Sequence, residues 1–342
     1  LTHQNDHVNM GLSTSDVSPT ATRLALLMIH GSLMASARVL SAALAQKAQA
    51  FDAVLKLGRT HLQDAVPMTL GQEFSGYADC IARGVDDLEH AAKALHELNL
   101  GATAVCTGLN AGEGDVSLAN RNLSRYTGLP LKAASNRFRV PQSKGDGGGY
   151  SGAMRGLSQG LGKVASDLRL LSMGPRAGIS EITLPAVQPG SSIMPGKVNP
   201  SVPEMVNQVC YQVMGSDLTV AAAGEAGQLE LNVMMPVIAW NTIHVSRILR
   251  ESMKVLRIRC VEGIEADAAH CHELLDRSTA MATALSPFLG YAKTAEIAKE
   301  AVRTGRSIRE IVLEKGLMDE RQLTRILSAE TMTRPGVVGD GK

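Results

Sequence analysis

Residues 154–171, MRGLSQGLGKVASDLRLL, carry the clearest structural pattern in the sequence. Its apolar side chains recur every three or four residues, which is the spacing of one face of an α-helix. They form a heptad-like stripe made of Met154, Leu157, Leu161, Val164, Leu168 and Leu171. The stripe predicts a long helix that packs lengthwise against other helices in a bundle.

Similar helical patterns lie on both sides of this stretch. An earlier stripe with the same spacing consists of Phe74, Tyr77, Ile81, Val85, Leu88, Ala92 and Leu95. Long helical segments are also predicted over residues 19–50, from about residue 203, and over 236–261, with shorter helices after 266. We therefore predict an all-α fold: a central helix-bundle domain at 10–267, a small C-terminal helical domain at 268–342, and a remnant of an N-terminal domain at 1–9.

The composition supports helices packed on helices. Of 342 residues, 44% are hydrophobic and only 3% are aromatic, whereas β-rich folds rely on aromatic and β-branched residues. The formal net charge of +1 excludes a strong electrostatic field for nucleic acid or an anionic membrane. The five cysteines are odd in number and lack metal-ligand spacing, which indicates reduced thiols of a cytoplasmic protein.

The N-terminal third contains one long apolar segment. Residues 24–45 are interrupted by His30 and Arg38, so we interpret them as a buried helix and not as a membrane span. Ser18 is expected to cap this helix, with Pro19 at its first position. No secretory signal is visible, and because the chain begins at Leu1 we expect an N-terminal portion to be absent.

A glycine-rich segment separates the two apolar stripes. Residues 101–152 contain many Gly, Asn and Ser residues, and they include GDGGGYSG at 145–152. Gly147, Gly149 and Gly152 match a G-x-G-x-x-G pattern, but no strand precedes them, so a dinucleotide site is not supported. We expect a flexible loop over Gly145–Gly152.

Three polar segments between the helical stretches carry the candidate chemistry. They are NDHVNMGLSTSD at 5–16 with Ser13, Thr14 and Ser15, GRTHLQDA at 58–65 with Thr60 and His61, and GSSIMPGKVNP at 190–200 with Ser191, Ser192, Lys197 and Asn199. Lysine supplies a point charge, and hydroxyl and amide groups supply hydrogen bonds, which suits a carboxylate ligand. The helix expected near Pro203 would present N-terminal amides to an anion. A small dicarboxylate is the expected ligand, with no metal or other cofactor.

Each segment also has a structural interpretation. Ser and Thr near Pro19 could only cap a helix, and a single His between helices is usually a hydrogen-bonded structural residue. Lys197 could be a solvated surface charge. The functional interpretation rests on the joint occurrence of the three segments.

The third segment carries a family resemblance. It matches the pattern G-S-x-x-M-x-x-K-x-N through Gly190, Ser191, Met194, Lys197 and Asn199, and in this pattern the chain resembles the fumarase/aspartase superfamily. GRTHLQDAVPMTLGQEF and GATAVCTGLN are similar to family segments in the expected order. The resemblance implies a bundle of long helices from four chains. It also implies a homotetramer in which each active site draws on three subunits.

The resemblance also implies roles for individual residues. Ser191 resembles the base that removes a proton beside a carboxylate, with Ser13, Thr14 and Ser192 around the doubly charged aci-carboxylate that results. Lys197, Asn199 and Thr60 would hold the other carboxylate, and His61 would lie near the leaving group. Glu204 resembles the acidic partner that orients this histidine in fumarases.

Within the superfamily, the segments point in two directions. Residues 168–178, 184–192, 202–210 and 227–241 resemble aspartases, which eliminate ammonia from L-aspartate to give fumarate, whereas 290–301 and 330–336 resemble fumarases. Most of these segments favour the aspartase reaction, with fumarate hydration as the alternative. A structural protein without activity is a further alternative, which the intact polar segments argue against.

The sequence departs from the family pattern at three places. The chain starts after a conserved segment that touches the substrate in the family. Ser15 stands where the family usually has an Asn that contacts the leaving group, which leaves room for another succinyl-type substrate. The stretch SKGDGGGYSG replaces acidic and apolar helix residues.

Overall fold

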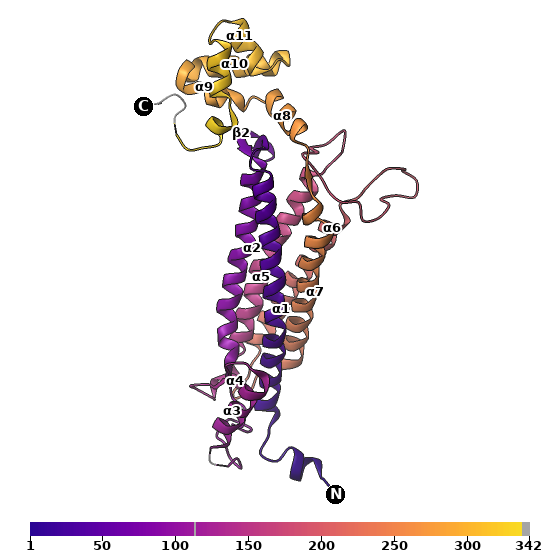
Figure 1. Ribbon diagram of the computed structural model, residues 1–342. Helices are drawn as coiled ribbons and strands as arrows, with labels where there is room; N and C mark the ends of the chain where they lie inside the picture. The colour runs from indigo at the N-terminus through magenta and orange to yellow at the C-terminus, as the bar shows by residue number, and fades with distance from the viewer. Residues whose placement is uncertain (113, 337–342) are drawn as a thin grey trace. The chain divides into compact units, whose positions relative to one another are not determined.

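The computed structural model describes residues 1–112 and 114–336 (Figure 1). The chain divides into two compact units, and both are discontinuous in sequence. Unit 1 contains Leu1–Ser41, Asp79–Ser166 and Ser201–Arg257, and unit 2 contains Ala42–Ala78, Asp167–Pro200 and Ile258–Lys342. Residues 337–342 of the predicted C-terminal domain lie outside the described part.

Unit 1 is built on long helices that run side by side (Figure 1). These are α1 (Thr14–Ala50), α2 (Leu70–Ala92), α5 (Gly145–Leu171), α6 (Ser201–Glu225) and α7 (Met235–Arg259), some of which continue into unit 2. The predicted stripe of α5 is buried, with Met154, Leu161 and Val164 at 0% exposure. The all-α bundle prediction is therefore confirmed. Short elements complete the unit: η1 (Gln4–Val8), η2 (Lys93–His96), β3 (Glu97–Leu98), α3 (Asp115–Thr127), β4 (Lys132–Ala133) and α4 (Arg139–Gln142).

The start of α1 differs from the prediction. The helix begins at Thr14 and not at Pro19 after a Ser18 cap, so that Pro19 lies inside it. The buried Asp16 makes this possible, because its carboxylate accepts hydrogen bonds from the amides of Ser13, Gly101 and Thr103 at 3.0–3.2 Å. Pro19 has no N–H for the Ser15 carbonyl, which accepts the Asn99 side-chain amide at 3.0 Å instead.

The same helix is long and apolar enough to cross a membrane by length and composition alone. Within unit 1, Leu26, Leu33 and Leu40 of α1 are at most 1% exposed. Core helices of a bundle satisfy the same criteria, so the apolar face of α1 is explained by its packing.

The glycine-rich segment is the largest departure from the sequence prediction. Residues 145–152, expected as a flexible loop, form the first two turns of α5. Tyr150 is fully buried in this stretch, and its hydroxyl lies 3.1 Å from Nδ1 of His30 on α1. The burial of Tyr150 and Met154 outweighs the low helix propensity of glycine.

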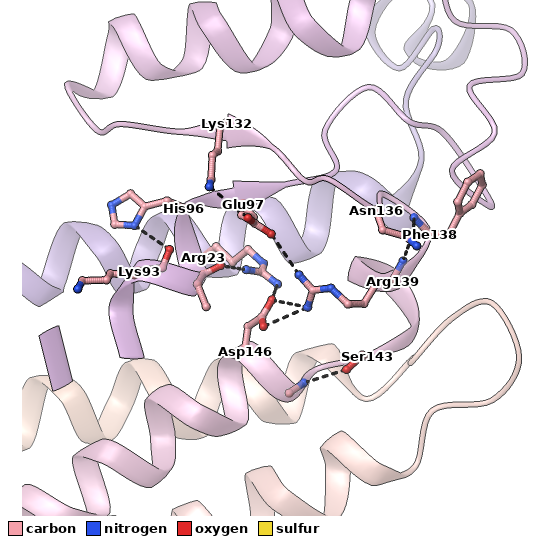
Figure 2. A network of polar contacts seen from close by, with 12 residues as sticks. Arg23, Lys93, His96, Glu97, Lys132, Asn136, Phe138, Arg139, Ser143 and Asp146 are labelled. Atoms are coloured by element: carbon pink, nitrogen blue, oxygen red, sulfur yellow. Dashed lines mark hydrogen bonds and ion pairs between the residues drawn. The ribbon is translucent and has the colours of Figure 1, made fainter. Parts of the chain in front are cut away.

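A charged network ties the start of α5 to its neighbours (Figure 2). Asp146 accepts hydrogen bonds from Arg23 of α1 at 2.6 Å and from Arg139 of α4 at 3.0 Å. Glu97 pairs with Arg139 at 3.3 Å and with Lys132 at 3.2 Å. Burial alone would raise the pKa of Asp146, but the hydrogen bonds and charges of both arginines outweigh it and lower the pKa.

We expect Asp146→Asn to destabilise the chain by roughly 1.5–3 kcal/mol at neutral pH, as for other charged hydrogen bonds. Because the pKa of Asp146 is lowered in the folded state, its stabilisation is present above the usual value of 3.8 and is lost as the pH falls through the folded value. Urea denaturation of both proteins at several pH values measures the difference. A difference that stays constant down to strongly acidic pH would contradict the assignment.

Unit 2 combines a β-hairpin with short helices. Strands β1 (Leu55–Thr60) and β2 (Gln63–Thr69) pair antiparallel, and β5 (Ile182–Thr183) pairs with β6 (Glu265–Ala266) next to η3 (Val261–Gly263). The helices are α8 (Ala268–Arg277), α9 (Met281–Leu289), α10 (Tyr291–Thr304), α11 (Ile308–Glu314), α12 (Glu320–Ile326) and α13 (Ala329–Met332). Leu55 and Leu57 of the hairpin join these helices in one apolar core. The start of α8 lies at the predicted domain boundary, but the boundaries themselves stay a prediction.

Candidate active site

The second polar segment forms the tip of the hairpin and not a connection between helices. Thr60 ends β1, Gln63 begins β2, and His61 and Leu62 make the turn with φ of 54° and 59°. Two-residue hairpin turns of this kind require positive φ at both positions, which non-glycine residues adopt at a cost. The strained turn presents the His61 side chain to solvent.

Buried ion pairs hold the base of this hairpin. Lys56 is 2% exposed, and its Nζ lies 2.7 Å from Glu73 and 2.8 Å from Glu181. Arg59 reaches the other oxygen of Glu181 at 2.8 Å. Glu181 is fully buried and directly precedes β5, which leads into the third polar segment. This cluster was not predicted from the sequence, where its signal is the alternation of Leu55 and Leu57 with charged residues.

The third polar segment is an exposed loop that closes on itself. The amide of Gly190 donates to the Lys197 carbonyl at 2.9 Å, and the Asn199 side-chain amide donates to the Gly190 carbonyl at 3.0 Å. A side chain at position 190 would place its Cβ 2.2 Å from the Lys197 carbonyl oxygen, so only glycine fits there. Asn199 therefore has a structural role, while its role in binding substrate stays a prediction.

Ser191 has the most informative geometry in this loop. Its side-chain oxygen accepts hydrogen bonds from the amides of Ile193 and Met194, both at 3.2 Å. Amide donors aimed at a hydroxyl oxygen stabilise its deprotonated form more than its neutral form. Ser192 and Lys197 are exposed in the same loop, so their side chains are available to a ligand.

The remaining predicted residues belong to unit 1. Ser13 precedes α1, and its hydroxyl accepts the Ser15 amide at 3.2 Å, which confirms a capping contribution. Thr14 is exposed, whereas Ser15 is 8% exposed. Glu204 lies half-buried in the first turn of α6.

The structure does not join all of these groups. Within the described part of unit 2, no hydrogen bond or ion pair links Thr60 or His61 to the loop at 190–200. Ser13, Thr14, Ser15 and Glu204 lie in the other unit. The convergence of all predicted residues on one ligand, including the contact of Glu204 with His61, therefore stays a prediction.

Two family models match this chain. A model described as "Lyase" matches residues 1–215, and one described as "Fumarase C C-terminus" matches residues 281–334. The chain therefore belongs to the fumarase/aspartase superfamily of lyases, as its loop at 190–200 predicted.

Individual relatives refine this placement. The chain is 48% identical to the aspartate ammonia-lyase of Helicobacter pylori (strain ATCC 700392 / 26695) over 333 residues, which cover 97% of this chain and 71% of the relative. A cobalt-bound crystal structure of a Brucella melitensis fumarate lyase:delta crystallin matches with a TM-score of 0.94 and 48% identity, over 97% of this chain and 72% of that one. The class II fumarase of Schistosoma mansoni matches with a TM-score of 0.91 and 35% identity, over 98% of this chain and 73% of that one.

Proposed function

We propose that this protein is an aspartate ammonia-lyase, which reversibly eliminates ammonia from L-aspartate to give fumarate. The observation that carries the proposal is the position of Ser191, whose oxygen receives two backbone amides in the signature loop of the superfamily. The identity to a named aspartate ammonia-lyase over 97% of the chain supports the choice of reaction.

In this mechanism Ser191 acts as the base. Its alkoxide, stabilised by the amides of Ile193 and Met194, removes a proton from the carbon beside one carboxylate of aspartate. The resulting aci-carboxylate carries two negative charges, and the hydroxyls of Ser13, Thr14 and Ser192 donate hydrogen bonds to it. The electron pair then forms the carbon–carbon double bond while the carbon–nitrogen bond breaks and ammonia leaves.

Other residues hold and orient the substrate. Lys197, Asn199 and Thr60 bind the second carboxylate, with Lys197 as its counter-charge. His61 lies near the departing amine, and Glu204 orients its ring. Ser15 stands where the family resemblance implies an Asn near the leaving group, so it is the residue to examine if L-aspartate is a poor substrate.

The proposal includes a homotetramer in the cytoplasm. Large apolar side chains are exposed on the helices of unit 1, including Met28 at 72%, Tyr211 at 63%, Leu218 at 73% and Trp240 at 69%. Exposed apolar faces of this kind favour association with further subunits. Free thiols at all five cysteines suit a reducing compartment. Light scattering of the purified chain tests the assembly.

Fumarate hydratase is the second candidate. The match of residues 281–334 to the fumarase C-terminal model and the similarity to the Schistosoma fumarase favour it. The two reactions share proton removal beside a carboxylate and differ in the group that leaves. The leaving group therefore has to be tested directly.

The deciding experiment follows fumarate by its ultraviolet absorbance with L-aspartate and L-malate supplied separately. The chain is assayed alone and also fused to those segments of the Helicobacter relative that it does not match. We expect fumarate from L-aspartate, and a rate lower by roughly 10²–10⁴-fold with a Ser191→Ala variant. Faster fumarate release from L-malate would replace the aspartase proposal with the hydratase. If a folded tetramer of the fused protein released no fumarate from either substrate, both proposed reactions would be refuted.

A further inference from the structure

Lys144 is a buried amine that the proposed mechanism does not use. It lies between α4 and α5 in unit 1, and its side chain is 9% exposed. Its Nζ donates to the Val140 carbonyl at 3.2 Å, and no acidic side chain in the described structure pairs with it. Burial, followed by the charge of Arg23, lowers the pKa of Lys144 to about 8. Much of the amine is therefore uncharged under mildly alkaline conditions.

A small cavity adjoins this amine. It has a volume of about 40 Å³ and is lined by Lys144 and Arg23 together with apolar side chains such as Leu26, Val140 and Ile238. One water needs roughly 10–15 Å³ on this measure, so the cavity has room for a molecule of about three atoms.

The charged network of Figure 2, next to this site, carries an excess of positive charge. In this network three cations pair with two carboxylates; the cations are Arg23, Arg139 and Lys132, and the carboxylates are Asp146 and Glu97. Protonated Lys144 adds a fourth cation. A group that converts Lys144 from a cation to an anion would balance the charges.

We propose that Lys144 is a carbamylation site, where its side-chain amine takes up carbon dioxide. The nitrogen lone pair attacks the carbon of the ligand and forms a nitrogen–carbon bond. One carbon–oxygen π pair moves onto oxygen, and the nitrogen releases a proton to water. The product is an anionic carbamate beside the Arg23 guanidinium, and the reaction needs no other reactant.

Carbon dioxide suits this site better than other electrophiles. It is a linear molecule of three atoms that enters an apolar cavity without losing strong hydration. An aldehyde would form an imine that leaves no negative charge, so the excess of cations would remain. The site is also independent of the proposed lyase function, because it shares no residue with that mechanism.

The charged and titratable groups around Lys144 set its response to pH. They are Arg23 from α1, Arg139 from α4, Asp146 from α5 and the Cys106 thiol, while α7 contributes the apolar Met235 and Ile238. At a fixed concentration of dissolved carbon dioxide, carbamate formation should increase as the pH rises towards the pKa of Lys144, about 8. The positive charges of Arg23 and Arg139 then stabilise the anionic carbamate.

The test uses the full chain with carbon-13-labelled bicarbonate and has no need of lyase activity. Carbon-13 NMR should show a protein carbamate, and trapping with a trialkyloxonium reagent should place the added mass on the peptide that contains Lys144. Peptide analysis separates this site from the exposed N-terminal amine of Leu1. The carbamate at Lys144 should disappear in Lys144→Arg and Lys144→Met, with helical content checked by circular dichroism.

Lys132→Arg is the matched control, because Lys132 belongs to the same network but is 67% exposed on its side chain. This variant should keep the label on the Lys144 peptide at the wild-type level. An unlabelled Lys144 peptide in the wild-type chain at saturating carbon dioxide would overturn the proposal. Labelling of Lys132 to the same extent as Lys144 would also overturn it, since the cavity would then confer no selectivity.

Discussion

Ser191→Ala should lower kcat for fumarate formation by roughly 10²–10⁴-fold, the range expected for loss of a general base. KM should change little, because the hydroxyl acts on the transferred proton and other groups bind the two carboxylates. The amides of Ile193 and Met194 donate to this oxygen at 3.2 Å, and alanine leaves them without an acceptor. Steady-state kinetics with L-aspartate measure both constants.

Ile193→Ala is the control within the same loop. The Ile193 side chain is 83% exposed, and its backbone amide is retained in the variant. This variant should keep kcat near that of the wild type. Equal losses in the two variants would mean that the loop, and not the Ser191 oxygen, limits the reaction.

Glu181→Gln should destabilise the chain by about 3–5 kcal/mol, as when one partner of a buried ion pair is removed. Glu181 is 0% exposed and binds Lys56 and Arg59 at 2.8 Å each. The variant leaves Lys56 with Glu73 alone and leaves Arg59 without its carboxylate. The midpoint of urea denaturation should fall accordingly.

A surface carboxylate of the same unit is the matched control. Glu273 of α8 pairs with Arg277 at 3.4 Å, and both side chains are more than half exposed. Glu273→Gln should leave the denaturation midpoint almost unchanged, because exposed pairs contribute little. A similarly small effect of Glu181→Gln would show that the buried cluster does not hold the hairpin.

The apolar pattern was a reliable guide to the long helices. The stripes of α2 and α5 are buried as predicted: Phe74 in the first and Leu168 in the second are both 0% exposed. The period of three or four residues shows which face of a helix is apolar. It can therefore be recognised without knowing which helices pack against that face. The loop at 190–200 was equally informative, because a short run with several specified residues occurs rarely by chance.

Two local predictions were wrong because they relied on propensity alone, and one hairpin was missed. Glycines at 145–152 favour a loop, yet Tyr150 and Met154 provide buried contacts that keep the segment helical. Ser18 and Pro19 form a typical helix start, but the helix begins five residues before Pro19, where Asp16 binds the amides of residues 101 and 103. The hairpin at 55–69 was missed because its pairing depends on register between two strands.

The helical class, the superfamily and the candidate base could be predicted without the structure, because apolar period and motif spacing are local properties of the chain. Only the tertiary structure showed that two amides bind the Ser191 oxygen, that Glu181 links Lys56 to Arg59, and that Lys144 borders a cavity. Each of these depends on burial or on backbone conformation, and the buried contacts join residues far apart in the chain. Such contacts arise from packing, which no local pattern specifies.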